Sequence, residues 1–260
     1  MTTPLFERDG DRLVATPLTA GPWDRDHAHG GATSALLAHE LERVPSLVPM
    51  TAMRLTVELF RPLTRAPVQV RTQVLREGRR VQLVQALLVG DDGTQLSSAT
   101  ALRIRHADVD VPPANDELPS ELVGGPDGLP RFTGNEIWPW GFFEVAELRV
   151  PDGELGPSST AGWVRLTVPV VDDEPITALS RAAAAGDFGN GVSAPLPMDR
   201  YLFINPDLTV TIDRPPQDGW VGLAPRSIAR PTGVGRTVTV LADRRGCIGT
   251  ALQSLYVAVR

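Results

Sequence analysis

Two polar residues, Asp187 and Gln253, are candidates for holding and activating a water molecule. Asp187 follows an alanine-rich segment and is flanked by Gly186, Gly189 and Gly191, which leave open backbone for a substrate to approach. A carboxylate there can accept a proton from water. Gln253 lies in a largely apolar stretch, and its amide can hold a water through one group while the backbone holds the other. Simpler interpretations stay open, namely a turn for Asp187 and an outward-facing or otherwise partnered group for Gln253.

A second group of candidate residues is His29-Gly30-Gly31. The glycines allow a tight entry into a helix and close packing of its N-terminus, which is one interpretation. The other is that this helix N-terminus binds a carbonyl or anionic group beside His29. His27 is two residues away, but no third ligand stands in register, so we predict no metal site and no cofactor.

Composition limits the classes of function. The 260 residues carry a net charge of -6, and all 25 basic residues are arginine, so a nucleic-acid partner is not expected. Cys247 is the one cysteine, which excludes an intrachain disulfide and suits a reducing compartment. The first ten residues include acidic side chains and no apolar core of signal-peptide length, and nowhere do 18 apolar residues run together. We therefore expect a cytoplasmic protein without a membrane anchor.

The sequence contains an internal repeat. Residues 55–62 match residues 208–215 at five of eight positions (Leu, Thr, Val, Arg and Pro), with a constant offset of 153. The same offset places Gly93 on Gly246, and each of these glycines precedes an apolar, strand-like run. Two separate matches at one offset indicate a tandem duplication.

The apolar patterns predict the same order of elements in both halves: a strand, a helix, then an antiparallel meander. In the first half these elements are expected at 12–18, 32–44, 53–60, 67–77, 80–90 and 95–105. In the second half they are expected at 161–170, 176–185, 208–212, 220–230, 235–243 and 248–260. Residues 107–136 are rich in Pro, Asp, Glu and Gly and predict a linker that crosses the surface without adding to a core. We expect one unit at 1–106 and another at 137–260.

A strand, a central helix and a twisted antiparallel sheet that curls around the helix form the hotdog arrangement, an α+β fold. Two tandem copies form a double hotdog. The sequence resembles the acyl-CoA thioesterase II type of double-hotdog proteins, in the thioesterase-like branch common in actinobacteria. The resemblance covers nearly the whole chain apart from the linker. It rests on His29-Gly30-Gly31, Phe60-Arg61-Pro62, Gly186-Asp187-Phe188, Asp213-Arg214-Pro215 and Ala251-Leu252-Gln253.

The resemblance implies a catalytic group in the second half. In the family, a carboxylate after the second helix, a hydroxyl at the next strand and a Gln on the last strand hold and polarise the attacking water. By position these are Asp187, Asn205 and Gln253, and Asn205 departs from the family's Thr. An Asn side chain can still hold a water as donor and acceptor. The substrate-binding residues are expected to be His29, Gly30, Gly31, Phe188 and Gly189.

The resemblance implies hydrolysis of acyl-CoA or another acyl thioester. Asn205 leaves open a second interpretation, a double-hotdog protein that binds an acyl or other hydrophobic ligand without hydrolysing it. Asp24 and His29 faintly resemble the Asp and His pair of hotdog hydratases, so a dehydratase is a further alternative, although that family's Asn-Pro pattern is absent. Because hotdog units expose sheet edges, we expect a homodimer or a larger homo-oligomer.

Two further groups of residues bear on substrate binding. The densest aromatic cluster, Trp138, Trp140, Phe142 and Phe143, is interpreted as a hydrophobic plug for the second unit, with an acyl-binding wall as the alternative. An acidic protein needs a local basic patch to bind the phosphates of coenzyme A. The candidates, most of which we expect to be solvated surface charges, are Arg226, Arg230, Arg236, Arg244 and Arg245.

Overall fold

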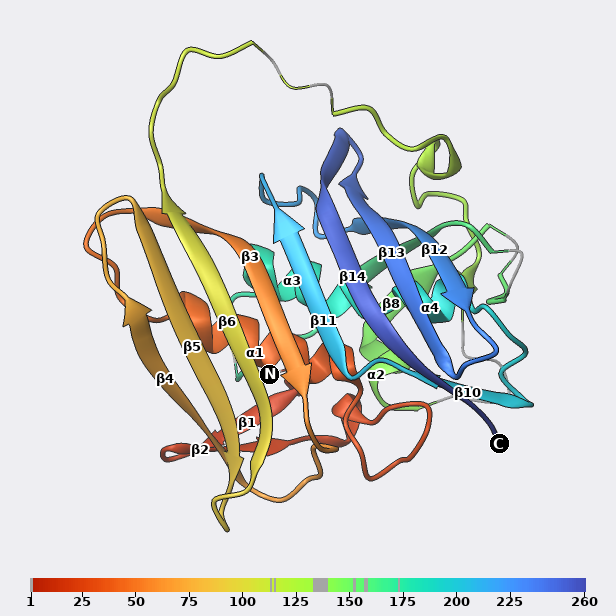
Figure 1. Ribbon diagram of the computed structural model, residues 1–260, viewed down its shortest axis with the longest axis horizontal. Coiled ribbons are helices and arrows are strands. Elements are labelled where there is room, and N and C mark those ends of the chain that lie inside the picture. Colours follow the sequence, from red (N-terminus) through yellow and green to blue (C-terminus); the bar gives the residue numbers. More distant parts are fainter. Residues whose placement is uncertain are drawn as a thin grey trace.

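The computed structural model describes residues 2–112, 114, 116–132, 140–151, 153–156, 159–172 and 174–260. Among these residues, 14 strands form one sheet, and the two longest helices pack side by side on one of its faces (Figure 1). The strand sequences explain this layering, because in β5 (Val81–Gly90) every second side chain is buried. One face of the sheet therefore covers the core and the other faces solvent.

The N-terminal unit is built around α1 (Gly30–Glu42). Its strands lie in the spatial order β1 (Phe6–Asp9), β2 (Arg12–Ala15), β4 (Val68–Arg76), β5, β6 (Gln95–Arg105) and β3 (Met50–Leu59), with the 3-10 helix η1 at Pro17–Thr19. The helix contacts β3 to β6, and ten of its 13 residues are buried. Its small residues, such as Ala32 and Ala35, let it pass close to the sheet. This is the central helix of a hotdog unit.

The C-terminal unit repeats this plan around α3 (Ala178–Gly186). Its strands lie in the order β11 (Asp207–Ile212), β14 (Gly246–Val259), β13 (Val234–Asp243), β12 (Val221–Ala229), β9 (Gly162–Leu166), β8 (Ala146–Arg149) and β7 (Arg131–Phe132), with β10 (Tyr201–Ile204) beside β14. Short helices are η2 (Ser120–Leu122), α2 (Phe142–Val145) and α4 (Gly189–Val192). No helix in the described ranges is both long and apolar enough to cross a membrane.

The two units meet edge to edge through equivalent strands of the repeat. Strands β3 and β11 are antiparallel, and Thr56 pairs with Thr209, the residue 153 positions later. The Thr209 hydroxyl donates a hydrogen bond to the Thr56 hydroxyl at 3.4 Å. Pairing between equivalent residues places a pseudo-twofold axis at this point. The structure thus confirms the double hotdog that the sequence predicted.

Several predicted boundaries were wrong. The first helix begins at Gly30 instead of residue 32, because the His29 side chain accepts a hydrogen bond from the N–H of Gly31 and caps it. The strand predicted at 161–170 ends at Leu166. Beyond it, the carbonyls of Pro169 and Val170 bond to the N-terminal segment. Strands β1, β7, β8 and β10 were not predicted, and each has only two or four residues.

The linker also differs from its prediction. Leu122 is 1% exposed and packs with Trp163 and Trp220 in a small second core. Phe132 joins the main core through β7. The segment therefore adds two apolar anchors where a purely surface path was expected, because isolated apolar residues among polar ones leave little periodic signal. Of the aromatic cluster, Trp138 lies outside the described residues.

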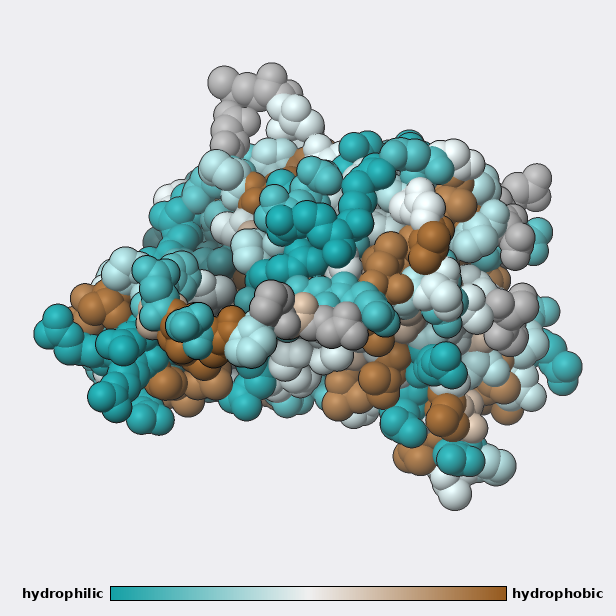
Figure 2. All heavy atoms as spheres, turned by 90° about the horizontal axis from the view of Figure 1, so that it is seen from above, coloured by the Kyte–Doolittle hydropathy of each residue, from teal (hydrophilic) through white to brown (hydrophobic). Residues whose placement is uncertain are grey.

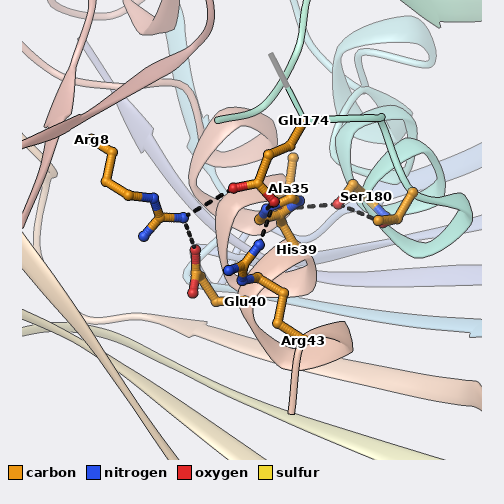
Figure 3. Close-up of polar contacts among 8 residues, drawn as sticks. Arg8, Ala35, His39, Glu40, Arg43, Glu174 and Ser180 are labelled. Carbon is orange, nitrogen blue, oxygen red and sulfur yellow. Dashed lines mark hydrogen bonds and ion pairs between the residues drawn. The ribbon is translucent and has the colours of Figure 1, made fainter. Parts of the chain in front are cut away.

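Helices α1 and α3 run antiparallel and in contact. Near the middle of the pair, the Ser180 hydroxyl donates to the carbonyl oxygen of Ala35 at 3.1 Å (Figure 3). A Cβ on Gly31 would lie 2.9 Å from the carbonyl oxygen of Ala184, so the start of α1 touches the end of α3. The pair therefore has two equivalent ends, each combining one helix start with one helix end.

One of these ends is filled by an ion cluster (Figure 3). Glu174, just before α3, pairs with Arg43, lies 3.2 Å from Nε2 of His39 and 3.4 Å from Arg8. Arg8 on β1 also pairs with Glu40 at 3.0 Å. Burial lowers the pKa of His39, against the opposing effect of Glu174. These contacts join the N-terminal strand and α1 to the C-terminal unit.

Candidate functional site

The opposite end of the helix pair holds a buried carboxylate. Asp187 follows the last residue of α3 and is 4% exposed. The Nδ2 of Asn205 donates a hydrogen bond to its Oδ1 at 2.7 Å. The Nε2 of Gln253 donates to its backbone oxygen at 3.2 Å and lies 3.5 Å from Oδ1. The structure therefore brings together the three residues expected to be catalytic, from α3, the turn after β10, and β14.

Asn205 and Gln253 hold this carboxylate in different ways. Both N–H groups of Asn205 are used, because Nδ2 also donates to the carbonyl oxygen of Asp207 at 3.2 Å. Its Oδ1 accepts no hydrogen bond from the described residues, so it can accept one from water. Gln253 is 1% exposed, and its Oε1 accepts a hydrogen bond from the N–H of Asn190 at 3.1 Å. Gln253 thus lies behind Asp187 and supports it.

His29 brings the N-terminal unit into the site. Its Nδ1 lies 3.0 Å from Oδ2 of Asp187, and its side chain is 10% exposed. The ring packs against Phe142 and Phe188, with centroid distances of 4.9 and 5.0 Å, and these two phenyl rings also contact each other at 5.8 Å. The aromatic contacts and the helix cap fix the position of the imidazole. The site is therefore shared between the two units.

The glycines around the site are required by close packing. A Cβ on Gly30 would lie 2.8 Å from Oδ2 of Asp187, so only glycine leaves room for the carboxylate. A Cβ on Gly189 would lie 2.4 Å from Oγ1 of Thr239. Gly30 also lines the cavity described next, whereas Gly31 and Gly189 do not. Of the three glycines expected to bind substrate, the structure exposes one to the cavity.

A cavity of about 410 Å³ opens beside Asp187. Its polar lining includes His29, Asp187, Asn190 and Asn205. Its apolar lining comes from both units and includes Leu59, Leu63, Phe143, Phe188, Met198 and Phe203. A cavity of this size with a few convergent polar groups is typical of a small-molecule site. Sequence patterns did not mark Leu63 or Met198, because each is a solitary apolar residue, and Leu59 was noticed only as part of the repeated segment 55–62.

The aromatic and basic residues singled out from the sequence lie in different parts of the structure, and only some of them line the cavity. Phe142 is fully buried against His29, whereas Phe143 lines the cavity, so the cluster serves both as packing and as wall. None of the five predicted phosphate-binding arginines lines this cavity, and Arg244 is paired with Asp127 at 2.6 Å. The arginine that does line it is Arg61, from the Phe60-Arg61-Pro62 motif.

Arg214, the repeat equivalent of Arg61, has a structural role. The guanidinium forms two hydrogen bonds with the buried Asp243, at 2.6 and 2.9 Å. Backbone N–H groups of Gln217 and Arg245 donate to the same carboxylate at 3.0 and 2.8 Å. Burial alone would raise the pKa of Asp243, but the hydrogen bonds from Arg214 and the two backbone groups lower it overall. The duplicated motif thus lines the cavity in one unit and braces the sheet in the other.

The other arrangements considered from the sequence are not formed. Asp24 lies 3.5 Å from His27, while His29 contacts Asp187, so the two residues that resembled a hydratase pair have other partners. Within the described part of the chain, no three His, Cys, Asp or Glu side chains converge as a metal site would require.

Comparison with protein families gives two matches along the chain. The model described as the acyl-CoA thioesterase N-terminal domain matches residues 19–104, and the model described as the acyl-CoA thioesterase C-terminal domain matches residues 110–257. Together they span both units. No curated protein has a significantly similar sequence.

Solved structures share the fold over nearly the whole chain. A hot dog fold protein of unknown function from Alicyclobacillus acidocaldarius is 17% identical, with 98% of this chain and 96% of that chain covered and a TM-score of 0.72. An acyl-CoA thioesterase II from Mycobacterium marinum is 16% identical, with 98% and 96% covered and a TM-score of 0.69. The tesB protein of Mycobacterium avium subsp. paratuberculosis is 20% identical, with 97% and 96% covered and a TM-score of 0.66. At these identities the likeness shows the fold.

Proposed function

The chain belongs to the acyl-CoA thioesterase family, and we propose that it hydrolyses acyl-CoA thioesters with a water molecule activated at Asp187. The observation that carries this proposal is the arrangement of Asp187. A buried carboxylate, held by the Asn205 and Gln253 amides, faces a largely apolar cavity. Such a group can remove a proton from water while the apolar walls hold an acyl chain.

The attacking water would bind between two acceptors. One of its hydrogens points to the Asp187 carboxylate, which has lone pairs beyond those used by its present partners, and the other points to Oδ1 of Asn205. An oxygen lone pair of the water is then directed into the cavity, toward the thioester carbonyl carbon. Asn205 can thus do the work of the family's Thr. Gln253 positions Asp187 from behind, through its backbone oxygen.

The start of α1 supplies a donor for the developing oxyanion. Gly30 is the first residue of the helix and lines the cavity, and its N–H has no acceptor among the described residues. The first N–H groups of a helix carry the positive end of its dipole. A carbonyl oxygen placed there gains negative charge in the transition state and is stabilised most at that moment.

The cavity lining also suits the remainder of the substrate. Apolar side chains from both units surround the inner space and favour an acyl chain over a charged one. Arg61, which lines the cavity and is exposed, can pair with a phosphate of coenzyme A in an otherwise acidic protein. We place the thioester carbonyl between these two regions, beside Gly30 and Asp187.

Release of free thiol from a panel of acyl-CoA substrates tests the proposal. We expect Asp187→Asn to lower kcat by roughly 10²- to 10⁴-fold, the usual effect of losing a general base. Asp9→Asn makes the same change of charge at an exposed position on β1 and serves as the matched control. Equal turnover by Asp187→Asn and the wild type would overturn the assignment.

The alternative is a protein that binds an acyl or other hydrophobic ligand without cleaving it. The observation that favours it is Asn205, because an amide cannot supply the hydroxyl that the resemblance implies at this position. Calorimetric binding of acyl-CoA with no thiol release across the whole panel would support this alternative. Any release that depends on Asp187 would exclude it.

A further inference from the structure

The Nδ1 atom of His29 has two neighbours that compete for it. It lies 3.0 Å from the backbone nitrogen of Gly31 and 3.0 Å from Oδ2 of Asp187. A ring nitrogen has one site in the plane of the ring, which is either a lone pair or an N–H. Without a proton, Nδ1 accepts a hydrogen bond from Gly31. With a proton, it donates to Asp187.

The two contacts therefore correspond to two protonation states of one fixed ring. The rings of Phe142 and Phe188 pack against the imidazole and hold it in place in both states. Exchange between the states needs only the transfer of a proton over a single contact of 3.0 Å.

We propose that His29 stores the proton that Asp187 removes from water during the reaction, an inference that rests on the proposed thioesterase function. As the water oxygen bonds to the carbonyl carbon, one O–H bond breaks and its proton moves to Asp187 and on to Nδ1 of His29. An imidazole is a stronger base than a carboxylate in water, so this transfer regenerates the Asp187 carboxylate. When the C–S bond breaks, its electron pair stays on sulfur, and the proton returns through Asp187 to form the thiol.

The charges around His29 make Asp187 its principal partner. Asp187 is the one acidic or basic group of the described residues within 4.0 Å of the ring nitrogens. The other titratable groups that line the cavity are Asp24, His27, Arg61 and Tyr256. Of these, Asp24 and His27 face each other at 3.5 Å, and His27 is 40% exposed. Changes of charge at His29 are therefore coupled chiefly to Asp187.

The test is the pH profile of thiol release by His29→Asn and His29→Phe. Asn is a preferred helix cap, so His29→Asn keeps the acceptor for Gly31 but cannot carry a proton. Phe keeps an aromatic ring against Phe142 and Phe188. We expect kcat to fall at least tenfold in both variants, KM to change less than threefold, and the acid limb of the kcat/KM profile to change position, because Asp187 is then the one base of the pair left to protonate. His106→Asn, at an exposed position after β6, is the control.

A purely structural role gives a different result. If His29 only caps α1, His29→Asn will match the wild type in kcat and in the shape of its pH profile, and the proposal is overturned. Added imidazole provides a second kinetic readout in His29→Ala, where it can occupy the space beside the two phenyl rings. Restoration of kcat that increases with the fraction of neutral imidazole supports the proposal, and no restoration counts against it.

A measurement without substrate separates this proposal from the proposed function. The protein has four histidines, so the ¹⁵N signals of the His29 ring can be assigned by comparison with His29→Asn. We expect Nδ1 to change from acceptor to protonated donor as the pH falls, with a midpoint that moves to lower pH in Asp187→Asn, where the carboxylate charge is lost. An unchanged midpoint overturns the pairing even if the wild type hydrolyses acyl-CoA. A shifted midpoint without any hydrolysis supports the pairing and rejects the thioesterase.

Discussion

Gly30→Ala would place a methyl group against the Asp187 carboxylate. The added Cβ would lie 2.8 Å from Oδ2 and 3.0 Å from Oδ1, whereas an ordinary contact begins near 3.4 Å. The carboxylate or the helix start must therefore shift by about 0.6 Å. Because Asn205 and Gln253 hold Asp187 on its other side, the shift distorts the hydrogen bonds that orient it.

We expect Gly30→Ala to lower kcat and to leave the stability of the fold nearly unchanged. A displacement of about 1 Å in an active site can cost roughly 10²-fold in rate, so we expect kcat to fall by about tenfold to a hundredfold. Unfolding free energy should stay within about 1 kcal/mol of the wild type, because alanine loses less backbone entropy than glycine on entering a helix. Thiol release at saturating acyl-CoA and urea unfolding measure these two effects separately.

Gly156→Ala is the matched control, because a Cβ there meets no atom within 4 Å. It should leave both kcat and stability close to those of the wild type. Full activity in Gly30→Ala would refute the role of Asp187 as the base, because the added methyl group would displace its carboxylate from the position that it has in the structure. A large loss of stability would instead show that the helix start, and not the carboxylate, absorbs the strain.

Three further predictions concern the rest of the molecule. Asp243→Asn breaks the buried pair with Arg214 and should lower the free energy of unfolding by about 3 kcal/mol in urea titration. Since the pKa of Asp243 is lowered in the folded protein, its stabilisation is complete above the ordinary range of Asp and is lost as the pH falls through the folded value. Wild-type stability should therefore decrease in acid more steeply than that of Asp243→Asn, and equal slopes would contradict this. Gln253→Ala should lower kcat at least tenfold with little change in KM, because it frees the backbone of Asp187 and Asn190 without altering the cavity lining; unaltered kcat would show that this support is dispensable. Light scattering should give a mass above 28.0 kDa, the mass of one chain. The reason is that apolar side chains gather along the lower edge of Figure 2, where the solvent-facing side of the sheet lies. A 28.0 kDa species at micromolar concentration would contradict the predicted homo-oligomer.

Much of the fold could be predicted because local apolar patterns indicate the elements and the internal repeat shows the same order of elements in both halves. Partial alternation of apolar residues located the seven long meander strands β3, β4, β5, β6, β12, β13 and β14. The offset of 153 indicated the duplication but not the pairing of β3 with β11, because a repeat records similarity between segments and not contact between them. Short strands such as β7 have too few residues to show a period, and their pairing depends on neighbours distant in sequence.

Of the site, the sequence predicted residues but not their contacts. Asp187, Asn205 and Gln253 were identified by their positions in a family pattern, and the structure places them within hydrogen-bonding distance. The contact between His29 and Asp187 was not predicted, because it joins residues from different units and no local pattern records such a pair. The same holds for Gly30, which looked like a residue chosen for helix entry.

The amino-acid sequence by itself determined the two hotdog units and the types of group available for chemistry, because periodicity and duplication are properties of the chain alone. Only the tertiary structure decided which end of the helix pair became a site. At one end Glu174 and its ion partners fill the space, while at the other Gly30 and Asp187 leave a cavity. The physical reason is packing between antiparallel helices, where a single absent Cβ determines whether a carboxylate fits.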